Sequence, residues 1–298
     1  METPWGWVGR LYVGAPGYHR SVEALTAPDG RVIAPTSPFY NAHLTRRIDL
    51  TESLGYFWVA FDGEAIDFEP GQYFTIGVDV AGKLVQRPYS VASSPREKGS
   101  GYELYIRLVP EGAFTPLLWL LAEGAPMHMK GPKGRFLLDP GDERTHLFIS
   151  SGTGIAPFIS MMRTLRMAGA PRRTVVLHGA SYVEDLGYRE EVEGHQRAGT
   201  YPCEYIATIS RPSAPENAGW GGRTGRVETI VPDVLDELDL TPDNAIAYLC
   251  GNPDMIENAD ALLTARGFAE TQVKKELYWP KGKAPTRAPV GGVAVAAE

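Results

Sequence analysis

Four consecutive residues, Arg87-Pro88-Tyr89-Ser90, combine side chains that suit a dinucleotide cofactor. They follow an alternating segment (72–78) typical of a β-strand, so Arg87 and Tyr89 are expected on one face. Arginine presents a planar charged fork to a pyrophosphate, and a tyrosine ring can lie flat against a planar ring system. A serine hydroxyl can donate to, or accept from, a ring nitrogen. The segment therefore suits a flavin, although the tetrapeptide alone also fits an ordinary half-buried strand.

Two glycine turns further along the chain suit a second nucleotide. Residues 150–157 (SSGTGIAP) join an apolar strand to a helix, and Gly152 and Gly154 let the backbone approach a ligand. Amides at a helix start favour a phosphate. Residues 250–253 (CGNP) follow a later strand, where ligands bind in open α/β sheets. The alternatives are a tight strand-to-helix turn at the first site and a buried structural thiol at Cys250.

The spacing of apolar residues and turns predicts two domains of different architecture. Short alternating segments up to Pro140 predict a small antiparallel β-barrel, interrupted by one short helix at about 115–122. After Pro140, strands alternate with helices, which indicates a parallel sheet covered by helices. The expected segments are an irregular N-terminal extension (1–42), the barrel (43–140), the α/β domain (141–279) and a flexible C-terminal tail (280–298).

Composition excludes several classes of protein. The 298 residues have a net charge of −7 and a pI near 5.5, which argues against a general nucleic-acid binder. Two cysteines exclude a four-cysteine iron–sulfur centre within this chain, and we expect no metal site. There is no basic segment followed by an apolar run at the N-terminus, and the longest mid-chain apolar stretch (117–122) is too short to span a bilayer. We therefore expect a soluble, cytoplasmic protein with no membrane partner.

Taken together, the motifs resemble those of the bacterial ferredoxin (flavodoxin)–NADP reductases. The resemblance runs from about residue 43 to residue 279, with the motifs in the family's order and at its spacing. The matching segments are RPYS (87–90), GTGIAP (152–157), HGASYVEDLGY (178–188), Ser210-Arg211, CGNP (250–253) and Tyr278-Trp279. The resemblance implies a FAD-binding barrel followed by an NADP-binding α/β domain.

The resemblance also implies roles for individual residues. In the FAD site, Arg87 would bind the pyrophosphate, Tyr89 would pack against the isoalloxazine, and Ser90 would hydrogen-bond near flavin N5. Tyr278 or Trp279 would shield the flavin or its adenine. The residues expected at FAD are Arg87, Pro88, Tyr89, Ser90, Gly112, Phe114, Thr115 and Trp279. Those expected at NADP are Gly152, Thr153, Gly154, Ser181, Arg211, Arg226, Gly251 and Pro253, and those expected to take part in catalysis are Ser90, Cys250 and Tyr278.

One departure from the family bears on the choice of coenzyme. Close bacterial relatives commonly have arginine where this chain has Ser181. A 2′-phosphate is best bound by charge-assisted donors, which Arg211 and Arg226 still supply at the family positions. No acidic residue stands at these positions to repel the phosphate. NADP is therefore the expected coenzyme.

The resemblance implies an enzyme that exchanges a hydride with NADP(H) and single electrons with a carrier such as ferredoxin or flavodoxin. The hydride would pass between nicotinamide and flavin beside Ser90 and Cys250. A steric role for Cys250 is an equal alternative to a chemical one. Two other functions fit the same motifs. One is the NAD(P)H-dependent reductase component of an oxygenase system, and the other is a non-catalytic flavin- or nucleotide-binding subunit.

Overall fold

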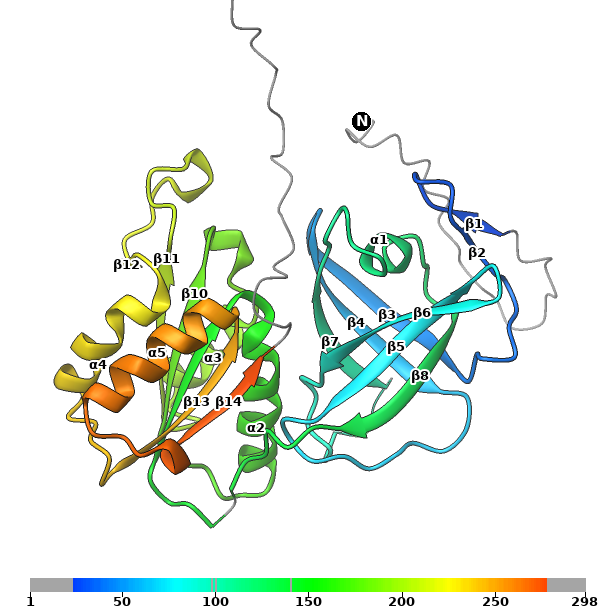
Figure 1. The fold of residues 1–298 in the computed structure, drawn as a ribbon. Coiled ribbons are helices and arrows are strands. Elements are labelled where there is room, and N and C mark those ends of the chain that lie inside the picture. The colour runs from blue at the N-terminus through cyan, green and yellow to red at the C-terminus, as the bar shows by residue number, and fades with distance from the viewer. Residues whose placement is uncertain (1–23, 98, 100, 140, 278–298) are drawn as a thin grey trace, which may run out of the picture.

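The computed structural model describes residues 24–97, 99, 101–139 and 141–277, and these form two adjoining domains (Figure 1). The first is an antiparallel β-domain and the second is a parallel sheet with helices on both faces. This confirms the fold class expected from the sequence. Among the described helices, none is long and apolar enough to cross a membrane.

The first domain is built on an eight-stranded antiparallel sheet in the order β1-β2-β5-β8-β3-β4-β7, with β6 paired to β5. A single bridge between Val91 and Leu104 links the chain after β6 to β7 and closes the barrel. Its interior contains apolar side chains that alternate along the strands, as in Phe74, Ile76 and Val78. The elements are β1 (Leu25–Thr26), β2 (Val32–Ile33), β3 (Ala42–Thr51), β4 (Leu54–Phe61), β5 (Tyr73–Val80), β6 (Lys83–Ser90), β7 (Tyr102–Arg107), α1 (Thr115–Leu118) and β8 (Pro126–Lys133).

Two local expectations differ from the structure of this domain. Residues 24–42 are not wholly irregular, because β1 and β2 form a hairpin that pairs with the end of β5 through Ile33 and Val80. Helix α1 ends at Leu118 rather than near residue 122. The chain leaves the helix after one helical turn and packs Leu121 into the barrel core.

The second domain is a six-stranded parallel sheet in the order β12-β11-β10-β9-β13-β14. The chain first adds strands on one side of β9 and then on the other, so the topological switch point lies between β9 and β13. The strands are β9 (Thr145–Ser151), β10 (Thr174–Ala180), β11 (Cys203–Ile209), β12 (Arg223–Thr224), β13 (Ala245–Gly251) and β14 (Val273–Leu277). The α-helices are α2 (Ala156–Met167), α3 (Arg189–Ala198), α4 (Val231–Glu237) and α5 (Pro253–Ala265).

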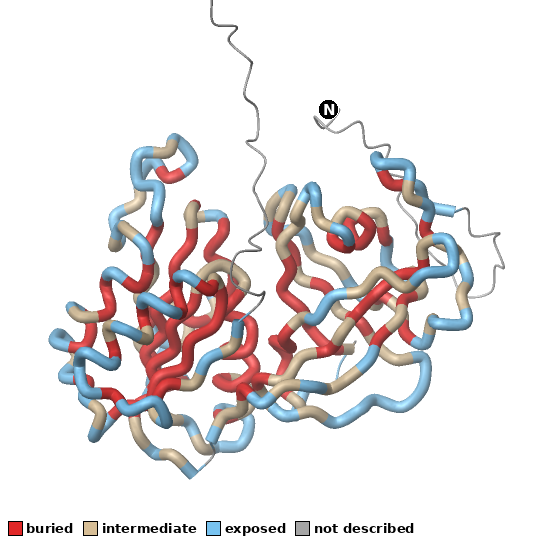
Figure 2. Tube along the Cα trace, in the orientation of Figure 1, coloured by how far each residue is buried: buried red, intermediate tan, exposed pale blue. Residues whose placement is uncertain are grey.

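Alternate side chains of the parallel strands enter two separate cores. Leu147 and Ile149 of β9 pack with α4 and α5, whereas Phe148 packs with α2 on the opposite face. The α2 side also contains Leu54 and Tyr105 of the barrel, so this core extends across both domains. Figure 2 shows the resulting continuous buried region in the sheet and along the contact between the domains. The cores therefore hold the carboxyl ends of the parallel strands beside the barrel.

Two buried histidines predict how stability depends on pH. Burial lowers the pKa of His146 and of His178 from 6.5 to about 4. Between these values the unfolded chain binds protons that the folded protein excludes, so the stabilisation present above pH 6.5 is lost as the pH falls towards 4. The free energy of unfolding should fall with decreasing pH, at a slope for each ring that approaches about 1.4 kcal/mol per pH unit midway between the two pKa values.

Urea unfolding at pH 7, 6 and 5 measures this slope, and His146→Phe is the informative variant. It removes one of the two titrating rings and should reduce the slope by up to about 1.4 kcal/mol per pH unit. Identical slopes for the variant and the wild type would show that His146 does not titrate with a lowered pKa.

Candidate functional site

A cleft of about 820 Å³ lies between the two domains and is lined by both of them. The barrel contributes the end of β6, part of β7 and the segment leading into α1. The parallel sheet contributes residues at the carboxyl ends of its six strands. The residues that line it include Tyr73, Arg87, Pro88, Tyr89, Ser90, Tyr105, Arg107, Gly112, Phe114, Thr115, Ser151, Gly152, Thr153, Ser181, Asp185, Ser210, Arg226, Glu228, Gly251, Asn252, Glu276 and Leu277.

The Arg87–Ser90 segment forms the barrel wall of this cleft. Among the described strands, β6 pairs along its length only with β5, so Pro88 can occupy it although proline has no N–H for a second ladder. Arg87 is exposed, and its guanidinium donates to the Gln86 carbonyl at 2.7 Å. Tyr89 is half-buried, with its ring 6.0 Å from that of Phe114, and the strand ends at the buried Ser90. A charged fork, an aromatic face and a hydroxyl thus adjoin one another in the cleft.

The segment that leads into α1 forms the neighbouring part of the barrel wall. Gly112 donates its N–H to the Val109 carbonyl, and a Cβ added at Gly112 would lie 2.9 Å from that oxygen. The Thr115 hydroxyl accepts from the Val109 N–H at 2.9 Å and donates to the Val109 carbonyl at 3.2 Å. Thr115 therefore fixes the shape of this loop with its side chain, while Gly112 and Phe114 line the cleft beside Tyr89.

The first glycine turn lies at the switch point of the parallel sheet. Gly152 has φ +55°, and a Cβ added there would meet no atom within 4 Å, so the backbone is open to a ligand in the cleft. Gly154 serves a different purpose, because a Cβ there would lie 2.2 Å from the Cys250 carbonyl oxygen. The two strand ends are also tied by a hydrogen bond from Asn252 N–H to Ser151 Oγ at 3.0 Å. The structure brings the two predicted glycine turns into one site.

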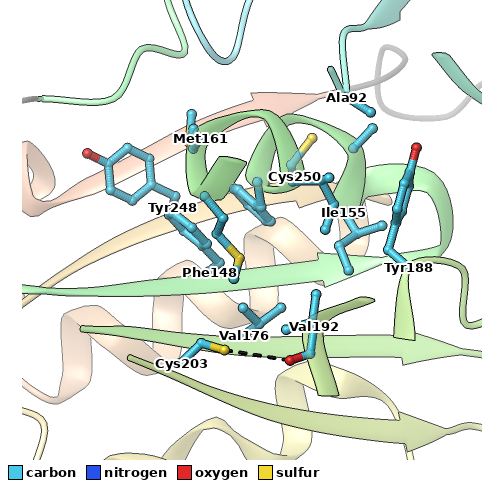
Figure 3. Close-up of a cluster of buried hydrophobic side chains, with 14 of the residues drawn as sticks. Ala92, Phe148, Ile155, Met161, Val176, Tyr188, Val192, Cys203, Tyr248 and Cys250 are labelled. Atoms are coloured by element: carbon cyan, nitrogen blue, oxygen red, sulfur yellow. Dashed lines mark hydrogen bonds between the residues drawn. The ribbon is translucent and has the colours of Figure 1, made fainter. Parts of the chain in front are cut away.

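The structure places Cys250 in a protein core rather than on the cleft wall. Its side chain is fully buried and belongs to the apolar cluster that includes Ile155 and Tyr248 (Figure 3). Gly251, with φ +135°, lines the cleft in its place. Pro253 is likewise buried, in the first turn of α5. This placement favours the structural interpretation of Cys250, and a direct catalytic role remains untested.

Of the three residues predicted to bind a 2′-phosphate, two line the cleft and one does not. Ser181 and Arg226 line the cleft, and Arg226 is exposed, 3.7 Å from the buried carboxylate of Glu228. Arg211 does not line it. Its guanidinium donates to the Tyr182 hydroxyl at 2.7 Å and lies over that ring at 5.5 Å. One cation and one hydroxyl of the predicted set therefore face the cleft.

Sequence reasoning missed an ion pair in the cleft wall. Arg107 of β7 forms a 2.8 Å pair with Asp185, whose side chain is 5% exposed. The Tyr105 hydroxyl reaches the same loop, accepting from Gly187 N–H at 3.1 Å and donating to the Asp185 carbonyl at 3.2 Å. These residues come from opposite domains, so no local pattern joins them. The predicted Tyr278 and Trp279 lie outside the described residues.

A second set of contacts holds the domains together behind the cleft. Arg163 of α2 donates to Glu103 of β7 at 2.8 Å and makes a bidentate pair with Glu191 of α3 at 2.7 and 2.8 Å. Tyr188 donates its hydroxyl to the other oxygen of Glu103 at 2.7 Å. Burial and the Glu103 carboxylate raise the pKa of Tyr188 well above its ordinary value, so this hydroxyl remains a neutral donor. Both oxygens of the buried Glu103 are therefore paired across the interface.

Two family models match the two domains separately. The oxidoreductase FAD-binding domain model matches residues 41–137, and the oxidoreductase NAD-binding domain model matches residues 148–261. The protein is thus an oxidoreductase with a FAD-binding barrel and an NAD(P)-binding parallel sheet, and the cleft lies where these two domains face each other.

Individual proteins similar to this chain place it in a family. Ferredoxin–NADP reductase B of Sorangium cellulosum is 36% identical over 200 residues, which cover 65% of this chain and 78% of that protein. The phenol hydroxylase P5 protein of Acinetobacter pittii is 34% identical, over 72% of this chain but 58% of that protein. A ferredoxin NADP⁺ reductase structure from Neisseria gonorrhoeae, with FAD and NADP bound, has a TM-score of 0.71 at 20% identity and covers 82% of this chain and 100% of that one. The chain belongs to the ferredoxin–NADP reductase family of FAD- and NAD-binding oxidoreductases.

Removal of the interface cation should destabilise the protein strongly. Arg163→Met leaves the Glu103 carboxylate buried without its counter-charge, which should lower the free energy of unfolding by about 3–5 kcal/mol. Arg266→Met is the matched control, because Arg266 pairs with Asp236 at the surface and should cost less than about 1 kcal/mol. Urea unfolding of both variants provides the comparison, and equally small losses would contradict a structural role for the Arg163 pair.

A methyl group at Gly154 should disturb the nucleotide turn selectively. Gly154→Ala forces the turn away from the Cys250 carbonyl, which should cost about 1–3 kcal/mol of stability. It should also weaken NADP⁺ binding in a calorimetric titration while leaving FAD content unchanged. Gly194→Ala in α3, where an added Cβ meets nothing within 4 Å, is the control. Normal NADP⁺ affinity in Gly154→Ala would argue against a nucleotide site at this turn.

Proposed function

We propose that this protein is a FAD-dependent reductase that exchanges electrons between NADP(H) and a one-electron carrier such as ferredoxin or flavodoxin. The principal support is the single cleft that is lined by Tyr89 and Ser90 of the barrel and by Gly152 and Gly251 of the parallel sheet. A nucleotide bound to each wall would place the two ligands next to each other in the same cleft. Bound FAD supplies the change between two-electron and one-electron chemistry.

On the barrel side, the residues fit a flavin dinucleotide. The exposed Arg87 would pair with the pyrophosphate, and the half-buried ring of Tyr89 offers an apolar face to the flavin. Ser90 would hydrogen-bond to the ring system from the end of β6. Gly112 and Phe114 would approach the same ligand from the loop that Thr115 holds in place.

On the sheet side, the residues fit a dinucleotide bound at the carboxyl ends of parallel strands. The open backbone at Gly152 and Thr153 would approach its pyrophosphate, with Gly154 allowing the close packing beneath. Arg226 and Ser181 would bind a 2′-phosphate, which favours NADP. Glu228 lies 3.7 Å from Arg226 and weakens this preference, since a nearby carboxylate opposes phosphate binding.

A reductase component of an oxygenase system is the second candidate. The phenol hydroxylase P5 protein is nearly as similar in sequence as the Sorangium reductase, although this chain matches only 58% of its length. Ser181 stands where close bacterial relatives commonly have arginine, so a 2′-phosphate would have one charge-assisted donor fewer, which reduces the preference for NADPH over NADH. In both candidates the electrons leave through a partner protein, which for the second candidate belongs to an oxygenase system.

Coenzyme and carrier preferences separate the two candidates. With FAD bound, NADPH should reduce the protein with a kcat/KM at least about tenfold above that of NADH, since one charge-assisted phosphate contact contributes roughly 1.4 kcal/mol or more. Arg226→Ala should remove most of this difference. Arg223→Ala should not, because Arg223 lies on β12, three residues before Arg226, and pairs with Glu237. Stopped-flow flavin reduction with both coenzymes measures the ratio.

Steady-state reduction of ferredoxin and of flavodoxin by the same protein tests the carrier. Transfer to either carrier with NADPH supports the proposal. A strong preference for NADH, with no transfer to either carrier, would instead support the oxygenase reductase.

A further inference from the structure

A buried histidine joins two strands of the parallel sheet to the first glycine turn. His178 lies on β10, where it is paired in register with Ser150 of β9, two residues before Gly152. Its imidazole is fully buried. Nε2 lies 2.9 Å from the Gly152 carbonyl oxygen, and Nδ1 lies 3.0 Å from the Tyr205 hydroxyl of β11.

The partners of the ring determine where its proton lies. A carbonyl oxygen can only accept, so Nε2 must bear the hydrogen, and Nδ1 of the neutral ring then accepts from the Tyr205 hydroxyl. Burial lowers the pKa of His178 to about 4, so the ring is neutral near pH 7. The hydrogen bonds therefore run in one direction, from Tyr205 through His178 to the Gly152 carbonyl.

This chain of hydrogen bonds fixes the orientation of one peptide group. In a trans peptide the C=O and the next N–H point in opposite directions, so holding the Gly152 carbonyl towards His178 turns the Thr153 N–H away from it. Gly152 and Thr153 line the cleft, whereas His178 and Tyr205 do not. Gly152 begins the short 3₁₀ helix Gly152–Ile155 with φ +55°, and since it has no side chain of its own, the His178 ring is the side chain that adds to the hold on this peptide.

We propose that His178 is a positioning residue that orients the Gly152–Thr153 peptide for the pyrophosphate of a nicotinamide dinucleotide. The inference rests on the proposed function in so far as it takes that dinucleotide as the ligand. Tyr205 supports it by fixing the tautomer that donates to Gly152. The pyrophosphate is common to NAD and NADP, so His178 affects the affinity for both coenzymes equally and does not affect the preference for one over the other.

A second buried histidine shows that burial alone does not require such contacts. His146 lies on β9 and is also fully buried, but neither ring nitrogen has a hydrogen-bond partner among the described residues. Its ring is stacked 5.7 Å from that of Tyr248, and it lies at the amino end of β9, whereas the first glycine turn follows the carboxyl end of that strand. His146 fills a core, whereas both nitrogens of His178 are paired and one of them reaches the cleft backbone.

The test is calorimetric titration of the oxidised, FAD-loaded protein with NADP⁺ and with NAD⁺. His178→Phe keeps a ring of similar size but removes the side-chain donor to the Gly152 carbonyl, and should weaken both coenzymes about tenfold with their ratio unchanged. Tyr205→Phe should weaken them about threefold. His178→Gln, whose amide has both a donor and an acceptor, should recover part of the loss. The maximal rate of flavin reduction at saturating NADPH should stay near the wild-type value.

His146→Phe is the matched control and should bind both coenzymes within about twofold of the wild type. Wild-type affinity in His178→Phe would overturn the inference, as would an equal loss in His146→Phe. If His178→Phe does not fold, Tyr205→Phe and His178→Gln decide between the outcomes by the same criterion. If the wild-type protein binds neither NADP⁺ nor NAD⁺, the proposed function fails instead, which is a separate result.

Discussion

The pairing of Arg163 with Glu103 across the domain interface is the interaction on which the site depends. Neither domain contains the cleft by itself, because one wall is the end of β6 and the other is the carboxyl edge of the parallel sheet. Glu103 is buried, and both its oxygens are occupied by groups of the other domain, Arg163 and Tyr188. A buried carboxylate is costly unless it is paired, so sliding of the domains is opposed by the need to keep these contacts. The apolar core that extends from Leu54 to α2 acts in the same direction.

Within that frame, the chemistry assigned to this chain is binding, orientation and exclusion of water. The cofactors supply the redox step, and the protein brings their sites into one cleft whose walls are held by buried groups. Gly152 leaves its backbone open, Gly154 permits the packing on Cys250, and His178 holds the peptide between Gly152 and Thr153. The ion pair of Arg107 with Asp185 joins the two walls within the cleft itself. Residues outside the cleft lining, such as Gly154 and His178, therefore help to determine how the ligands are placed.

The sequence was sufficient for the parts of the structure that local patterns encode. Alternation predicted most barrel strands, and the glycine turns at 152–154 and 250–253 were correctly assigned to strand ends. The short β12 and β14, and helix α4, were missed. Strand β12 is two polar residues long and shows no alternation, and β14 and α4 are short segments whose few apolar residues form a recognisable pattern only when packed on the sheet. Local patterns also did not predict which of the residues 250 and 251 faces the cleft. Cys250, near the end of β13, packs into the core, and the next residue, Gly251, lines the cleft. The pair of Arg107 and Asp185 joins residues 78 positions apart and exists only in the folded protein.

The most direct measurement is the visible absorption spectrum of the purified protein, loaded with FAD, before and after anaerobic addition of NADPH. If both nucleotides share the cleft, the protein should retain FAD and show the flavin band, and NADPH should bleach that band rapidly. A protein that takes up no FAD would contradict the barrel site. Bound flavin that neither NADPH nor NADH reduces would contradict the central claim, that the domain interface brings the two cofactor sites into productive contact.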